Sequence, residues 1–243
     1  KIMAKKKTED TINLDSILFK CRDILRAARN SGSFFEKRDM MLTLVFLRFI
    51  GEKYEDGIEK LRQIINLTLE NDIPSFANLP ASTGRRLKKL LMVISKSVPF
   101  KPNMSKLAEL IDANRNMMPD YFQYIEDAGM ITQLRDNTGG VRGLGKIEKV
   151  YLDNANLIYS LAEGEPNIGN IRETFFINQT RVRNVVTSSD ISDFQIDGRT
   201  FEIGGKSKGM KQIKEANEGY IVKDQIEYSS GNILPLWWFG LNY

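Results

Sequence analysis

The segment Gly140-Val-Arg-Gly-Leu-Gly-Lys146 has the spacing of a phosphate-binding P-loop, G-x-x-x-x-G-K. In a P-loop, backbone amides and the lysine hold nucleotide phosphates, and a following Ser or Thr holds magnesium. Here Ile147 takes the place of that hydroxyl residue. The segment also leads towards a strand, whereas a P-loop needs a helix N-terminus beside the phosphates. ATP binding at this segment is therefore not expected, and no Walker B strand ending in acidic residues is evident.

Histidine is absent from the sequence, and Cys21 is the one cysteine. The lack of histidine removes Ser-His-Asp and Cys-His catalysis together with every His-ligated metal site. A single cysteine cannot form an internal disulfide, and it leaves a thiolate zinc site without enough ligands. Any chemistry must therefore use carboxylates, lysines or hydroxyl groups.

The composition of the 243 residues is that of an ordinary globular protein, with 42% apolar and 27% charged residues. The formal charge of +4 suits an anionic partner such as nucleic acid, although the excess is small for this length. The apolar stretch from Met40 to Ile50 is shorter than the ~20 residues of a membrane span. Residues 1–10 lack the apolar region of a secretory signal. We expect a cytoplasmic protein without a membrane segment.

The middle of the chain has the element order of a winged helix. Helices are predicted for residues 85–98, 105–111 and 117–128, followed by strands over 130–134 and 146–152. The loop 136–145 between the strands is rich in Gly and Arg, as a wing should be. Apolar residues of the third helix are expected to form a core stripe rather than a cofactor site: Met117, Met118, Tyr121, Phe122, Tyr124 and Ile125.

If the third helix lies in a major groove, polar side chains at its start and along it can reach DNA. Wing residues would contact phosphates. The alternative is that the winged helix packs against a partner domain. The candidate DNA-binding residues are Asn114, Arg115, Asn116 and Gln123 for the helix, with Arg135 and Arg142 for the wing.

Amphipathic helices are also predicted over residues 13–29 and 36–61. Ile17-Leu-Phe19, Asp23-Ile-Leu25 and especially Phe46-Leu-Arg-Phe-Ile-Gly-Glu-Lys-Tyr-Glu55 make residues 1–62 similar to the N-terminal helical segment of the modification subunit of type I restriction systems. In that family the segment precedes an adenine methyltransferase domain. The Asn-Pro-Pro-Phe/Tyr motif of that enzyme is missing from this sequence, so methylation by this chain is excluded.

The sequence from Tyr151 onward resembles the C-terminal domain of a family of bacterial and archaeal AAA-type ATPases. Four segments carry this resemblance: Tyr151-Leu-Asp-Asn-Ala-Asn-Leu-Ile-Tyr159, Asn167-Ile-Gly169, Arg172-Glu-Thr-Phe-Phe176 and Pro235-Leu-Trp-Trp-Phe-Gly240. With the winged helix included, it covers about three quarters of the chain. The Walker motifs of the ATPase core are not found.

The same resemblance implies a relationship to PD-(D/E)xK nucleases, whose carboxylates hold magnesium while a lysine orients water. The matching positions are Glu173 on a helix, Asp193 before a strand, and Glu202 with Lys206. Asp193 and Glu202 would be the metal ligands. The motif's Glu-x-Lys spacing is replaced by Glu-x-x-x-Lys, which places Lys206 about 13 Å along a strand from Glu202 at ~3.3 Å per residue. A bulge at Gly204-Gly205 would shorten this distance.

We therefore predict an α+β protein in three parts: helices over 1–62, a winged helix over 63–152, and a small mixed sheet with flanking helices over 153–243. The leading hypothesis is a noncatalytic module, associated with DNA or docked on a protein and derived from an ATPase that lacks its P-loop core. One alternative is a magnesium-dependent nuclease. Another is an interaction subunit whose N-terminal helices bind a restriction-system protein. Double-stranded DNA and a protein are the expected partners, and no cofactor is expected apart from the nuclease's magnesium.

Overall fold

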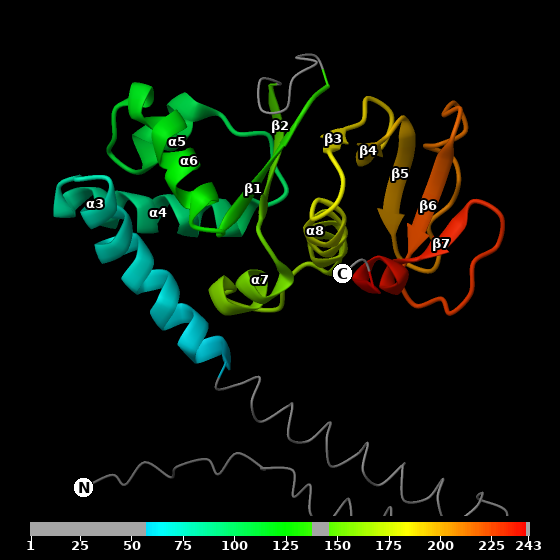
Figure 1. The fold of residues 1–243 in the computed structure, drawn as a ribbon, viewed down its shortest axis with the longest axis horizontal. Coiled ribbons are helices and arrows are strands. Elements are labelled where there is room, and N and C mark those ends of the chain that lie inside the picture. Colours follow the sequence, from blue (N-terminus) through cyan, green and yellow to red (C-terminus); the bar gives the residue numbers. More distant parts are fainter. Residues whose placement is uncertain (1–56, 138–145, 242–243) are drawn as a thin grey trace, which may run out of the picture. The chain divides into compact units, whose positions relative to one another are not determined.

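The computed structural model describes residues 57–137 and 146–241 (Figure 1). The chain divides into two compact units, Lys1–Glu59 and Lys60–Tyr243, and every element below belongs to the second. The helices predicted before residue 57, with the residues compared to the restriction subunit, lie outside the described residues. Arg142 lies outside them as well. The predicted α+β class is confirmed, because helices are followed by a five-stranded mixed sheet with flanking helices.

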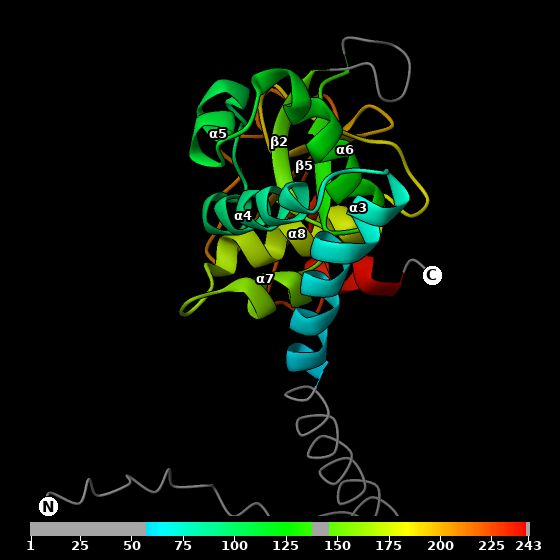
Figure 2. The ribbon, with the colours of Figure 1, turned by 90° about the vertical axis from the view of Figure 1, so that its left-hand side faces the viewer.

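The first part of this unit is helical. Residues 60–67 form a helix that runs into a π-helical turn, η1 (Thr68–Asp72), and then α3 (Ile73–Phe76). The helices that follow are α4 (Ala81–Ser97), α5 (Met104–Leu110), the 3-10 turn η2 (Arg115–Met117) and α6 (Met118–Asp127). Figure 2 shows α3, α4, α5 and α6 on the side that faces the viewer.

Sequence signals explain where these helices begin and end. The side chain of Asn103 accepts a hydrogen bond from the Lys106 amide and so caps α5. Pro119 stands in the first turn of α6, where its missing N–H costs nothing. Along α6 the apolar residues turn inward, and Met118, Tyr121, Phe122 and Ile125 are buried. The core-stripe interpretation is confirmed for these four residues, whereas Tyr124 is partly buried and Met117, in η2 before the helix, is exposed.

Two antiparallel strands follow α6: β1 (Ile131–Arg135) and β2 (Ile147–Leu152). Phe100, between α4 and α5, forms an antiparallel bridge with Val150 of β2. The full order is helix, bridge, helix, helix, strand, loop and strand. Apart from the single bridge of Phe100, this is the order predicted for a winged helix.

The chain then forms α7 (Ala155–Leu161), α8 (Ile168–Thr180) and a five-stranded sheet. The strands are β3 (Val186–Ser188), β4 (Phe194–Ile196), β5 (Arg199–Gly204), β6 (Gly219–Lys223) and β7 (Ile233–Pro235), and the 3-10 helix η3 (Leu236–Leu241) follows. The five strands lie side by side in the sheet in the same order in which they occur along the chain. The pairs β3–β4 and β4–β5 are antiparallel, whereas β5–β6 and β6–β7 are parallel.

The turn between β4 and β5 follows from its sequence. Asp197 and Gly198 have φ angles of 49° and 79°, and Asp-Gly is a preferred pair for a tight hairpin turn with positive φ at both residues. This turn fixes the register that sets Phe194 opposite Phe201. Both rings then face α8, whose Phe176 ring lies 5.1 Å from that of Phe194 and 5.5 Å from that of Phe201.

Two hydrophobic clusters share the strand β2. Val150 and Leu152 belong to the cluster formed mainly by the helices of the winged helix. Tyr151, between them, belongs to the cluster under the five-stranded sheet. Successive side chains of a strand point to opposite faces, so β2 can pack against both layers at once. The strand thereby connects the winged helix with the C-terminal sheet.

Among the helices in the described ranges, none combines the length and the apolar character that crossing a membrane requires.

Candidate functional site

The three carboxylates predicted from the nuclease resemblance lie on or beside elements of the C-terminal layer. Glu173 is on α8, Asp193 immediately precedes β4, and Glu202 is in the middle of β5. Their side chains are 19%, 16% and 2% exposed, respectively. Ionised carboxylates buried to this extent need compensating positive charge or hydrogen bonds. The partners of each carboxylate therefore define what the site can do.

Lys149 of β2 connects two of the carboxylates. Its Nζ lies 3.5 Å from Oε2 of Glu173 and 3.3 Å from Oδ1 of Asp193. Tyr151, two residues further along the strand and so on the same face, donates a hydrogen bond from its hydroxyl to Oε2 of Glu173 at 2.8 Å. The winged helix thus supplies a cation and a hydroxyl donor to carboxylates of the sheet layer.

Burial dominates the electrostatics of Glu173. It raises the pKa of this carboxyl above its ordinary value of 4.5, and the nearby charge of Asp193 raises the pKa further. Lys149 and the Tyr151 hydroxyl act in the opposite direction. Burial, with the charge of Glu173, also raises the pKa of Tyr151, so its hydroxyl keeps its proton and remains a donor.

Glu202 has a different set of partners. Phe201 and Ile203, on either side of it, pack into the cluster that contains Phe176 of α8. Strand alternation therefore turns Glu202 towards the opposite face of the sheet. There its Oε1 pairs with the Lys208 ammonium, and its Oε2 accepts a hydrogen bond from the Ser192 hydroxyl.

Gly204 makes the Lys208 contact possible. A Cβ at position 204 would lie 2.6 Å from Cβ and Cγ of Lys208 and 2.8 Å from its Cδ. The aliphatic part of Lys208 thus occupies the space of a side chain two residues after Glu202. This is the place where a Glu-x-Lys motif would carry its own lysine.

Lys206, the lysine predicted from the motif, lies beyond the end of β5 and is exposed. Its backbone carbonyl accepts a hydrogen bond from the Lys223 ammonium at 3.1 Å. The structure therefore pairs Glu202 with Lys208 and not with Lys206. Sequence reasoning missed Lys208 because its spacing of six residues matches no motif, and Gly204 was the one available signal.

Asp193 was predicted as a metal ligand together with Glu202. Its Oδ2 accepts a hydrogen bond from the Ile203 amide at 2.9 Å, while its Oδ1 faces Lys149. In the described part of the chain, no three Asp, Glu, His or Cys side chains come together as ligands for a metal ion. Each carboxylate already has a lysine partner, so the arrangement does not fit a divalent cation.

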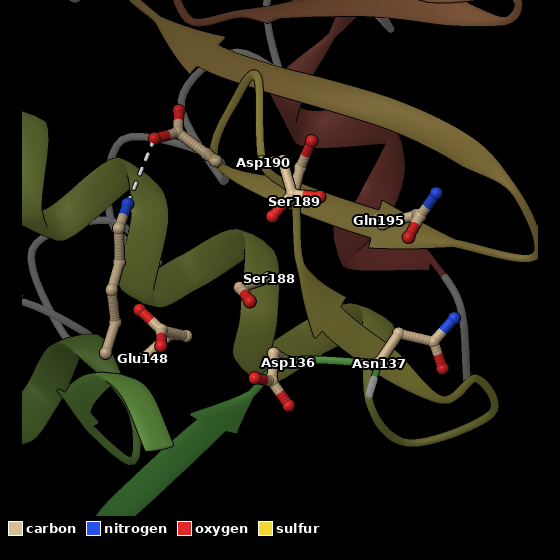
Figure 3. A pocket seen from close by; sticks show the side chains of 9 residues that line it. Asp136, Asn137, Glu148, Ser188, Ser189, Asp190 and Gln195 are labelled. Atoms are coloured by element: carbon tan, nitrogen blue, oxygen red, sulfur yellow. Dashed lines mark hydrogen bonds and ion pairs between the residues drawn. The ribbon is translucent and has the colours of Figure 1, made fainter. Parts of the chain in front are cut away.

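A pocket of about 600 Å³ opens beside the Lys149–Asp193 pair, between the base of the wing and the strands β3 and β4 (Figure 3). Among the described residues, four carboxylates line it, and Lys149 is the one lining cation. Such a lining favours cationic groups and repels phosphate. Its residues are Asp136, Asn137, Glu148, Lys149, Ser188, Ser189, Asp190, Asp193 and Gln195.

The predicted DNA-binding residues of the helix cluster around the start of α6. Asn114, Arg115 and Asn116 are exposed, and the Asn114 side chain caps η2 by accepting a hydrogen bond from the Asn116 amide at 2.9 Å. Gln123 is exposed on α6 and donates a hydrogen bond to Asp127 at 2.7 Å.

Acidic residues share the surface of α6 with these candidates. Asp120 and Asp127 are exposed on the same helix, whereas the nearest candidate cation, Arg115, precedes it. Arg135, at the end of β1, is partly buried and donates a hydrogen bond to Gln133 at 3.4 Å. Arg115 thus lies just before α6, and two carboxylates, Asp120 and Asp127, are exposed on that helix.

The fold and the site together define an α+β protein in which a winged helix is joined through β2 to a mixed sheet with lysine-paired carboxylates. Residues 50–174 match a family model described as a domain of unknown function (DUF8612), and the chain belongs to this family. The match covers the winged helix and continues into α8. No curated protein matches the chain. No solved structure matches it either.

Proposed function

We propose that residues 60–243 form a noncatalytic DNA-associated module whose nuclease-like sheet serves as a scaffold. One observation carries this proposal: the Lys149 ammonium lies within 3.5 Å of both Glu173 and Asp193. A metal-dependent nuclease needs those carboxylate oxygens for its cation. Here a lysine of the winged helix takes the cation's place.

The two cations differ in their chemistry. A bound magnesium ion polarises a phosphoryl oxygen and activates a water molecule through open coordination positions. An ammonium group compensates charge and donates hydrogen bonds, but it has no coordination position to offer a substrate. Lys208 plays the same compensating role for Glu202 on the other face of the sheet. The carboxylates therefore act as structural groups that tie β2 and the segment after β5 to the sheet.

Association with DNA is supported by the winged-helix order and by the exposed Asn114, Arg115 and Asn116 at the start of α6. The positive net charge is consistent with it. The resemblance to the C-terminal domain of an ATPase family supports a role as an attached module rather than as an enzyme. Docking on a protein is the other outcome of the experiment below.

The experiment mixes the purified full chain with a labelled DNA duplex and measures both the mobility and the cleavage of the duplex. It is done at low and moderate salt, with magnesium, with manganese and with a chelator. We expect a shifted, uncleaved duplex whose binding weakens with salt, because phosphate contacts release counterions. Arg115→Ala should weaken the shift. Cleavage that requires the metal and is lost in Asp193→Ala would overturn the proposal, whereas a duplex that never shifts would leave protein docking as the function.

A further inference from the structure

The connection between β5 and β6, residues 205–218, carries four lysines. Parallel neighbouring strands need such a crossover, which is usually a helix. Here it is built from turns and runs back along the strands (Figure 1). The sheet topology places this crossover against one face of the sheet. Its four lysines are Lys206, Lys208, Lys211 and Lys214.

Two contacts hold this crossover on the sheet. The Lys208 ammonium turns inward to the buried Glu202. Ile213 is 4% exposed and packs over Gly219 at the start of β6, where an added Cβ would lie 2.9 Å from Cβ of Ile213. The crossover is thus anchored at both ends, and the lysines that point away from it are held in place by the fold.

The other three lysines face solvent. Lys206, Lys211 and Lys214 are exposed, and across residues 57–137 and 146–241 none of their ammonium groups forms an ion pair. Glu218, at the end of the crossover, is instead paired with Arg199 at 2.9 Å. The Lys223 ammonium adds a further cation beside Lys206, whose carbonyl it contacts.

Two other surfaces of the unit are acidic. The exposed side of α6 carries Asp120 and Asp127, and the pocket beside Lys149 is lined by four carboxylates. A polyanion is repelled from these surfaces and attracted to unpaired lysines. Lysine binds phosphate as a point charge, without the geometry that reads a base.

From this arrangement we infer that the lysine crossover, through Lys206, Lys211 and Lys214, is a surface that contacts the phosphate backbone of duplex DNA. The inference rests on the proposed association with DNA, but it moves the main electrostatic contact from α6 to the sheet. Recognition there is independent of base sequence. The inward Lys208 holds the surface in position and does not itself reach the DNA.

The test compares three forms of the full chain: wild type, a triple variant with Lys206→Gln, Lys211→Gln and Lys214→Gln, and a matched control with Arg85→Gln, Lys89→Gln and Lys106→Gln. The control removes three exposed cations from α4 and α5, so both variants have the same net charge. Fluorescence anisotropy measures binding to a labelled duplex of arbitrary sequence over a range of salt concentrations. Thermal unfolding of each variant checks that the fold is retained.

We expect the crossover variant to bind the duplex about tenfold more weakly than wild type at low salt. The slope of log K against log salt concentration should be less negative by roughly 2 to 3, because fewer phosphate contacts release counterions. The control variant should stay within about twofold of wild type. Replacing the same three crossover lysines by arginine should retain binding. The inference is overturned if the crossover variant binds like wild type, if the control loses as much, or if wild type binds no duplex. If the protein cleaves the duplex in a metal-dependent way and the crossover variant still binds more weakly than the control, the noncatalytic function is refuted but the DNA-contacting surface is not.

Discussion

Lys208 reaches the buried carboxylate of Glu202 by laying its aliphatic stem across Gly204, where a Cβ would come within 2.6 Å of it. Glu202 is the least exposed of the candidate carboxylates, with 2% of its side chain accessible. The absence of a side chain at position 204 therefore gives Lys208, four residues later, the space that it needs to reach Glu202. It compensates a buried charge and fastens the crossover to β5.

The first prediction concerns that glycine. Gly204→Ala should displace Lys208 from Glu202, because the new Cβ overlaps the stem near its own Cβ and not at its flexible end. We expect a loss of about 1 to 3 kcal/mol in the free energy of unfolding, as for other overpacked sites. Urea denaturation measures it. Gly209→Ala is the matched control, since a Cβ there meets nothing within 4 Å. Equal stability of the two variants would contradict the arrangement.

A second prediction separates the two lysines near Glu202. Lys208→Ala leaves a buried carboxylate without its cation, which costs about 3 to 5 kcal/mol for fully buried pairs. Because the Lys208 side chain is 31% exposed, we expect a smaller loss, about 2 kcal/mol. Lys206→Ala, at an exposed position, should change stability by less than about 0.5 kcal/mol. The reverse order of these two losses would assign Glu202 to Lys206.

A third prediction follows from the raised pKa of Glu173. The folded protein keeps a proton on this carboxyl at pH values where the unfolded chain has released it. Stability therefore falls as the pH rises from about the ordinary pKa of 4.5 to the raised pKa of the folded state. Glu173→Gln should flatten this fall, because an amide does not titrate.

The measurement is the free energy of unfolding at several pH values, for wild type and Glu173→Gln. The amide oxygen of the glutamine can still accept the hydrogen bond from Tyr151, so the variant retains that contact. Glu109→Gln, at an exposed position on α5, is a control that should leave the pH profile as in wild type. Identical pH profiles for wild type and Glu173→Gln would show that Glu173 has the same pKa in both states.

Local patterns were enough to predict the order of the helices and strands between α4 and β2. The helix predicted over 85–98 occurs as α4, and the strand predicted over 146–152 occurs as β2, because apolar spacing and flanking prolines are local signals. The π-helical turn η1 has no such signal. A glycine explains its packing instead, since a Cβ at Gly84 would lie 2.8 Å from the backbone of Glu70 and Leu69.

The candidate site was predictable only in part. Glu173, Asp193 and Glu202 were found through a resemblance, but their partners come from distant positions. Lys149 is 24 residues before Glu173 and 44 before Asp193, and it reaches them because β2 packs against two layers. Lys208 depends on the path of an irregular crossover. Contacts that arise from tertiary packing produce no recognisable pattern of residue spacing in the sequence, so they could not be predicted from it.

Lys149 and Lys208, rather than a metal ion, compensate the three carboxylates of the C-terminal layer. Calorimetric titration of the full chain with manganese, at neutral pH and in the absence of DNA, measures whether these carboxylates also hold a metal ion. We expect no saturable binding at micromolar metal, because both lysines already compensate the carboxylate charges. Saturable micromolar binding of one ion that disappears in Asp193→Asn would contradict this expectation.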